Sequence, residues 1–128
     1  MKIFVSHSSS YDYVNKLYKP LQKSQINKDH KIFLLHEDRK DVLTKDIIKK
    51  SDVIVAEVSF PSTGQGIELG WANLYNIPII CCYQYASKPS GSLKYLAKDF
   101  IIYKNKDQMI EKLAIALEKL NNFSDRSS

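Results

Sequence analysis

Five short apolar runs recur along the chain, and a longer segment of helical character follows each of them. The runs occupy residues 2–6, 31–36, 52–58, 78–83 and 99–103. Nearly continuous apolar strands separated by helices are typical of a parallel sheet that is covered on both faces. Because crossovers between parallel strands are right-handed, the pattern predicts a single doubly wound α/β domain. Its five-stranded parallel sheet would be flavodoxin-like or Rossmann-like.

The helices that we expect between and after these strands differ in the strength of their signal. The clearest is the last, at residues 106–121, where apolar residues recur every three or four positions. The others are expected near residues 10–25, 41–50, 64–76 and 91–97. A chain of 128 residues can build one core but not two, so residues 1–121 are predicted to form one domain. The polar residues 122–128 are predicted to be a frayed tail.

Composition narrows the classes of partner. The formal net charge of +5 raises the question of nucleic acids, but the lysines are spread along the chain, which is typical of a solvated surface. We therefore expect no nucleic-acid partner, although a mildly positive field favours a small anionic ligand. No apolar run is long enough to cross a bilayer, and the chain opens on a strand pattern instead of a signal peptide. The expected location is the cytoplasm, without a membrane partner.

The two cysteines, Cys81 and Cys82, are neighbours within the fourth apolar run. Adjacent residues of a strand point to opposite faces, so these thiols are not expected to form a disulfide with each other. They are typical of small buried residues in a reducing compartment. No further Cys or His pair stands at ligand spacing, and the sequence predicts no metal site.

The stretch PSTGQGIELGWA, residues 61–72, follows the third run and concentrates three of the four glycines. Its glycines have neither the spacing nor the place, after the first strand, of a dinucleotide-binding loop. A different function fits better: Ser62 or Thr63 can cap the next helix, and Gly64 and Gly66 allow a ligand to approach the backbone. Helix amides together with the Ser62 hydroxyl suit a phosphate group.

Glu68 stands two residues beyond Gly66, and we expect it in the first turns of that helix near the mouth of the site. A carboxylate near a helix N-terminus is stabilised as the anion, which suits a nucleophile better than a proton donor. The residue pattern alone leaves open an equally good alternative, in which Glu68 only pairs with the helix dipole.

Residues 51–83, SDVIVAEVSFPSTGQGIELGWANLYNIPIICCY, resemble the core of the nucleoside 2-deoxyribosyltransferase superfamily. They are most similar to its branch of 2'-deoxynucleoside 5'-phosphate N-hydrolases, which carries the same strand, Pro-Ser, spaced glycines and ELG. The resemblance implies cleavage or transfer at the base–sugar bond of a (deoxy)nucleoside 5'-monophosphate or nucleoside. It makes Glu68 the nucleophile that forms a covalent glycosyl intermediate, and it requires no cofactor.

The same resemblance assigns the substrate contacts. It implies that Ser62 binds the 5'-phosphate, and that Ser92 or Ser90 contributes from the neighbouring subunit of a homodimer. The loop after the first strand has no glycine where the hydrolases have one. Its polar side chains are candidates for contacts with phosphate or sugar: Ser6, His7, Ser8 and Ser9.

This chain differs from the family at the acid that assists release of the base. Where the family has an acidic residue, this chain has Thr44, and Asp46, two positions further on, is the candidate substitute. His36 and Glu37 end the second run near the expected position of the base. For His36, a structural role in its loop is a stronger hypothesis than a catalytic role.

Two alternative functions follow from other features. The opening residues 2–21, KIFVSHSSSYDYVNKLYKPL, resemble the start of Toll/interleukin-receptor-type domains, some of which cleave NAD with a glutamate on the third helix. Thr44 in place of the acid favours a module that binds or senses a nucleotide without turning it over.

Overall fold

The computed structural model describes residues 1–38 and 43–127. They form one five-stranded sheet with every strand pair parallel, as predicted. The strand order is β2-β1-β3-β4-β5, which is the flavodoxin type of doubly wound fold. The strands are β1 (Lys2–His7), β2 (Lys31–Leu34), β3 (Val53–Glu57), β4 (Ile79–Gln84) and β5 (Asp99–Tyr103).

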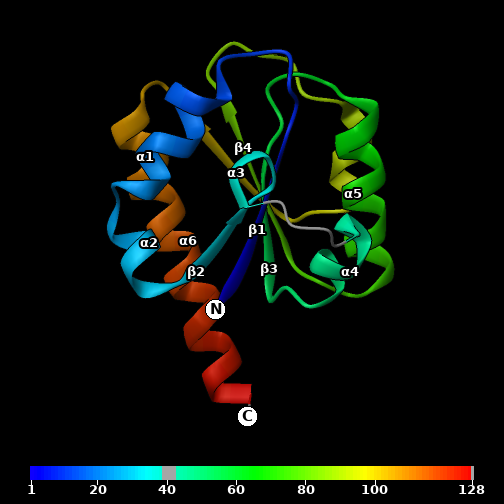
Figure 1. Cartoon of the computed structure of the whole chain (residues 1–128), viewed down its shortest axis with the longest axis vertical. Helices are drawn as coiled ribbons and strands as arrows, with labels where there is room; N and C mark the ends of the chain where they lie inside the picture. Colours follow the sequence, from blue (N-terminus) through cyan, green and yellow to red (C-terminus); the bar gives the residue numbers. More distant parts are fainter. Residues whose placement is uncertain (39–42, 128) are drawn as a thin grey trace.

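Helices cover both faces of this sheet (Figure 1). One face carries η1 (Val14–Tyr18), α1 (Lys19–Gln22), α2 (Gln25–Asp29) and α6 (Lys106–Ser127). The other carries α4 (Thr44–Lys49), α5 (Thr63–Leu74) and the short η2 (Gly91–Tyr95). The single turn α3 (Leu35–Asp38) follows β2. Within the described part of the chain, no helix combines the length and the apolar character needed to span a membrane.

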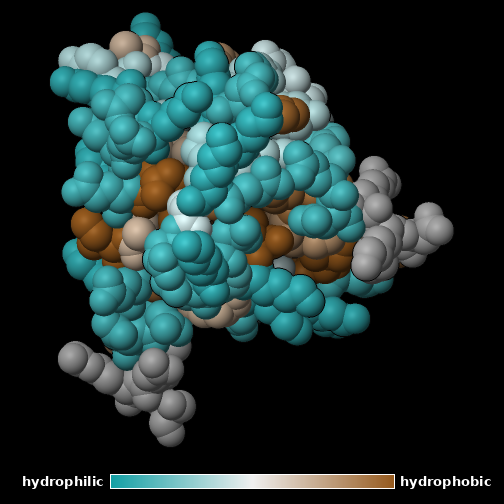
Figure 2. Space-filling model, turned by 60° about the vertical axis from the view of Figure 1, so that its left-hand side comes forward, coloured by the Kyte–Doolittle hydropathy of each residue, from teal (hydrophilic) through white to brown (hydrophobic). Residues whose placement is uncertain are grey.

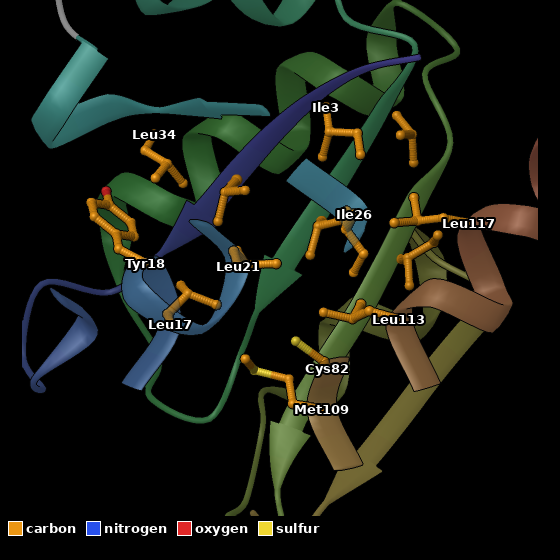
Figure 3. Close-up of a cluster of buried hydrophobic side chains, with 14 of the residues drawn as sticks. Ile3, Leu17, Tyr18, Leu21, Ile26, Leu34, Cys82, Met109, Leu113 and Leu117 are labelled. Atoms are coloured by element: carbon orange, nitrogen blue, oxygen red, sulfur yellow. The ribbon is translucent and has the colours of Figure 1, made fainter. Parts of the chain in front are cut away.

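Alternation along the strands divides the core into two layers. Ile3 and Val5 of β1 pack with α1 and α6, whereas Phe4 packs with α4 and α5. Figure 3 shows the first layer, in which Cys82 lies beside Met109 and Leu113 of α6. Cys81 belongs to the second layer, so the two thiols point to opposite faces and are free, as predicted.

Two helices differ from their predictions. The segment expected as one helix near residues 10–25 begins as a π-helical turn, continues as α1 and then restarts as α2. Pro20 explains the irregular start, because it has no N–H to donate to the carbonyl four residues earlier. The last helix runs six residues beyond Asn121, to Ser127, so the predicted frayed tail continues the helix. No Gly or Pro interrupts it there, and adding a turn to an existing helix needs no new nucleation.

The second run also ends earlier than predicted, at Leu34, and the chain turns into α3. The Asp38 carboxylate accepts a hydrogen bond of 2.8 Å from the Leu34 N–H, which stabilises this turn. The predicted helix near 41–50 starts at Thr44, and its positions 41 and 42 lie outside the described residues. On the face shown in Figure 2, hydrophilic residues cover most of the surface and hydrophobic residues show between them.

Candidate active site

The carboxyl ends of β1 and β3 meet where the chain reverses its direction across the sheet. From β1 the chain crosses to β2 on one side, and from β3 it crosses to β4 on the other. Ligands of open α/β sheets bind in the crevice at such a switch point. Residues from the ends of both strands and from α5, which follows β3, are therefore the first candidates for a site.

Ser6 and Glu68 come together at this point from distant parts of the sequence. Ser6 ends the buried part of β1, is 1% exposed and faces α5. Its hydroxyl donates a hydrogen bond of 2.8 Å to Oε1 of Glu68. Burial raises the pKa of Glu68, and the bond from Ser6 lowers it in part. The carboxylate is thus oriented by one donor and partly withdrawn from water, while it stays half-buried.

The sequence predicted that the N-terminus of the helix would stabilise the Glu68 anion, and this prediction was wrong. The first turn of α5 contains no acidic residue, because Glu68 follows Thr63, the first helical residue, by five positions. The helix dipole acts within the first turn, so it gives Glu68 little support. Burial dominates instead, and the pKa moves up and not down. The Ser6 hydroxyl is the group in contact that favours the anion.

The start of α5 is the predicted phosphate site. Ser62 is the N-cap, as predicted, and its hydroxyl accepts a bond of 3.4 Å from the Gln65 N–H. A side chain at Gly66 would meet no atom within 4 Å, and one at Gly64 would reach only the Ser62 hydroxyl. Neither glycine has a positive φ, so backbone strain does not require them. Both glycines are exposed, and the space beside them is open.

A cavity of about 490 Å³ adjoins this helix start. Ser62 and Gly66 line one side of it, and Ser90 and Ser92 of the η2 region line the other. The resemblance assigned Ser92 to a site in the neighbouring subunit, whereas the structure brings it to the same cavity as Ser62 within one chain.

Glu68 does not line that cavity. Two helix positions separate it from Gly66, which corresponds to about 200° of rotation. The two residues therefore lie on opposite flanks of the buried stripe Gln65, Leu69 and Ala72. Ser62, the N-cap of α5, lines the cavity and is the candidate phosphate residue.

His7 faces away from Glu68. Strand alternation turns it toward η1, where its Nε2 lies 2.6 Å from the Tyr18 hydroxyl and its Nδ1 lies 2.8 Å from the Ser8 carbonyl oxygen. Since a carbonyl only accepts, Nδ1 carries the proton and Nε2 accepts from Tyr18. Burial lowers the pKa of His7, so the ring is neutral and both nitrogens are engaged within the fold. His36 packs against His7, at 5.5 Å between ring centroids.

Ser8 is also committed to the fold. It is buried, its hydroxyl lies 2.8 Å from the Ser10 hydroxyl, and it accepts a bond from the Ser10 N–H. These contacts stabilise the turn that leaves β1. The structure therefore brings Ser6 to Glu68 but places His7 and Ser8 in the support of the loop.

Asp46 does not reach Glu68. It lies exposed in the first turn of α4, whereas Ile48 is the residue that α4 buries. Two helix positions place Asp46 roughly opposite Ile48. Burial and the Ser6 hydroxyl are the influences on the Glu68 pKa, and the Asp46 carboxylate is not among them.

Sequence reasoning missed Glu57, the last residue of β3. It is 1% exposed, and its carboxylate accepts bonds from the Ser59 N–H at 2.6 Å, the Ser59 hydroxyl at 2.8 Å and the Tyr103 hydroxyl. The signal that could have found it is the glutamate inside the otherwise apolar stretch VIVAEV, because a buried carboxylate requires partners.

Burial raises the pKa of Tyr11, and the negative charge of the Glu57 carboxylate raises it further. Its ring packs on Phe60 of the β3–α5 loop at 5.0 Å between centroids. Among the described residues, its hydroxyl is the buried side-chain oxygen without a hydrogen-bond partner. Among the side chains that the structure describes, no three His, Cys, Asp or Glu residues are grouped so that they could hold a metal ion.

Comparison with known proteins found similarity in a segment of the sequence and in the fold. No family model matches the chain. A protein of Syntrophotalea carbinolica, inferred to be a 2'-deoxynucleoside 5'-phosphate N-hydrolase, is 44% identical over 49 residues, which are 38% of this chain and 34% of that protein. One of Methanosarcina barkeri with the same name is 46% identical over 37 residues, or 29% and 23% of the two chains. The matched segments thus span about a third or less of these relatives.

Solved structures extend the likeness to the whole fold. The CMP N-glycosidase of Clostridium botulinum superimposes with a TM-score of 0.67 at 21% identity, over 89% of this chain and 99% of that one. The 2-deoxyribosyltransferase of Bacillus psychrosaccharolyticus gives 0.62 at 13%, over 85% and 90%. A conserved protein of Enterococcus faecalis gives 0.62 at 14%, over 91% and 98%. At these identities the likeness shows the fold. In fold and in a segment of sequence, the chain is therefore similar to the nucleoside 2-deoxyribosyltransferase-like superfamily, which confirms the resemblance seen in residues 51–83.

Proposed function

We propose that the chain is an N-glycosidase that acts on the base–sugar bond of a (deoxy)nucleoside 5'-monophosphate or nucleoside. The observation that carries the proposal is the half-buried Glu68 carboxylate, which the Ser6 hydroxyl holds at the switch point of the sheet. The similarity to N-hydrolases in sequence, and to an N-glycosidase and a deoxyribosyltransferase in fold, supports it.

The reaction that suits this carboxylate proceeds in two steps. An oxygen of Glu68 forms a bond to the anomeric carbon while the bond from that carbon to the base nitrogen breaks, and the base leaves with the electron pair and takes up a proton. Water then attacks the same carbon and releases the sugar phosphate, which frees the carboxylate. If a second base takes the place of water, the reaction becomes a transfer.

Three further features belong to the proposal. Ser62 with the backbone at Gly64 and Gly66 would hold the 5'-phosphate, and Ser92 lines the adjoining cavity. Asp46 is retained only as the candidate proton donor, which would require α4 to move toward the site, because it lies exposed in this structure. By the same resemblance we propose a cytoplasmic homodimer, which sedimentation of the purified protein would test.

A base-release assay tests the proposal directly. The protein is incubated separately with dCMP, dGMP, CMP, deoxycytidine and NAD, and free base or nicotinamide is measured by chromatography. Base release from a monophosphate supports the proposal. Cleavage of NAD alone would replace it with the Toll/interleukin-receptor-type activity. Thermal stabilisation by nucleotides with no base released would replace it with a sensor.

The Glu68 carboxylate also predicts the pH dependence of the reaction. A nucleophile must be ionised, so kcat/KM should fall as pH drops through the pKa of Glu68. Because burial raises that pKa, the acidic limb should lie above the value of an exposed glutamate, which is about 4.3. The profile is measured with a substrate that does not titrate in this range. A rate that is unchanged down to pH 4 would contradict a buried carboxylate nucleophile.

Ser6→Ala should weaken catalysis through the charge state of Glu68. Loss of a hydrogen bond to a charged group predicts a decrease of roughly tenfold in kcat/KM at neutral pH. It should also move the acidic limb to higher pH, because the bond that favours the anion is lost. Ser24→Ala, which removes a hydroxyl bonded to the Leu21 carbonyl, is the matched control. A lower rate with an unmoved limb would make Ser6 a structural residue only.

A further inference from the structure

The structure assigns to Glu57 the role of a positioning residue, which holds the β3–α5 turn so that Ser62 can bind the 5'-phosphate. This inference rests on the proposed function and adds to it how the phosphate-binding residue Ser62 is held in place. Glu57 and Glu68 are then two carboxylates with separate tasks, the first in binding and the second in bond cleavage.

The Glu57 carboxylate is the centre of a buried network. It accepts hydrogen bonds from the N–H and the hydroxyl of Ser59, the second residue after β3. It also accepts one from the hydroxyl of Tyr103 at the end of β5. Ser59 is itself buried, and its hydroxyl oxygen accepts the Gln84 N–H at 2.8 Å. The carboxylate thus joins the ends of β3, β4 and β5.

The backbone of Glu57 makes the connection to α5. Its carbonyl oxygen accepts a bond of 2.8 Å from the side-chain amide of Gln65, which is buried in the first turn of α5. The Gln65 N–H donates in turn to the Ser62 hydroxyl. Bonds from one residue therefore hold both ends of the turn that runs from the end of β3 to Ser62.

The network requires a carboxylate at this position. Three donors converge on the two oxygens of Glu57, and a carboxylate accepts on both. A glutamine has one accepting oxygen, and its NH₂ group would face at least one of these donors. Opposite the Ser59 N–H, the NH₂ group would leave that donor unsatisfied; opposite the two hydroxyls, it could donate to their oxygens but would remove the acceptor of their hydrogens. A buried donor without an acceptor costs more than the lost bond itself. The turn should then relax, and the phosphate site at Ser62 should relax with it.

The consequence for activity is selective because the Glu57 carboxylate lies on the opposite face of the sheet from the Ser6–Glu68 pair. Glu57 pairs in register with His7, whose side chain faces η1, whereas Ser6 and Glu68 meet on the α5 side. A change at Glu57 should therefore reach the phosphate contacts through Ser62 and leave the Ser6–Glu68 pair in place. Binding of the monophosphate should weaken, and cleavage of bound substrate should not.

The test uses Glu57→Gln with Tyr103→Phe as a second, milder variant. In Glu57→Gln we expect KM for a cleaved deoxynucleoside monophosphate to rise roughly tenfold, with kcat within about twofold of the unmodified protein. Tyr103→Phe should raise KM in the same direction by less, because two of the three bonds remain. For the nucleoside without phosphate, kcat/KM should not change in either variant. Glu118→Gln, at an exposed position of α6, is the control.

Each other outcome is decisive. A fall in kcat for both substrates, or an unchanged or lower KM for the monophosphate, would overturn the positioning role. If Glu57→Gln does not fold, judged by circular dichroism and thermal melting, Tyr103→Phe carries the same test. If the unmodified protein binds the monophosphate but releases no base, the proposed function fails, and the Kd of the monophosphate for the same variants still decides the role of Glu57.

Discussion

Glu68→Gln is expected to lower kcat for base release by at least about 10³-fold, the scale of loss seen when a nucleophile is removed. The amide cannot form the glycosyl ester, but it has the size of the carboxylate, and its oxygen can still accept the Ser6 hydroxyl. The site should therefore keep its shape, and the Kd of the monophosphate should stay within about threefold of the unmodified value. Base analysis by chromatography and titration calorimetry measure the two quantities.

Two comparisons make this result specific. Glu118→Gln applies the same chemical change at an exposed position of α6 and should keep full activity. Brief incubation of the unmodified protein with substrate, followed by mass spectrometry, should detect the mass of the sugar phosphate on the peptide that contains Glu68. Full turnover by Glu68→Gln, or a stable adduct on another residue, would disprove the nucleophile assignment.

Phe4→Ala should be the most damaging single change to stability. Phe4 is fully buried in the α5 layer and stacks on Phe33 of β2 at 5.8 Å between ring centroids. Truncation of a buried phenylalanine costs about 3–5 kcal/mol, a large part of the 5–15 kcal/mol that stabilises a typical domain. We expect little folded protein at 37 °C, measured by urea denaturation followed by circular dichroism.

Phe100→Ala is the matched control for that prediction. It makes the same truncation in another strand of the same sheet, but Phe100 lies on the edge strand β5 and is 40% exposed. Its loss should cost about 1 kcal/mol or less, because less apolar surface leaves water when the chain folds. Equal losses in the two variants would mean that the layer around Phe4 is not the centre of the core.

The strands were predictable because their signal is local. All five apolar runs became strands with ends within two residues of the prediction, and their parallel order follows from the helices between them. The cap at Ser62 was also predictable, since the residue that caps a helix and the amides that it satisfies are neighbours in sequence. The irregular start of the first helix was marked by Pro20, although its π-helical form was not.

In the candidate site, too, local features were predictable and contacts between distant residues were not. Residues 61–72 indicated where Glu68 lies and which helix carries it. They did not indicate that Ser6, 62 positions earlier, would orient its carboxylate, or that burial would outweigh the helix dipole. They also did not indicate that Ser6, and not its neighbour His7, contacts Glu68, because that depends on which face of the sheet each side chain occupies.

From the sequence alone came the α/β architecture, the cap of α5 and the placement of Glu68, since each depends on residues a few positions apart. Tertiary structure decided the partners. It joined Ser6 to Glu68, brought Tyr103 to Glu57, and left Asp46 exposed. Hydrogen bonds reach only about 3 Å, so they are decided by how β1, β3, β5 and α5 stack in space. That stacking depends on the register and packing of the whole sheet.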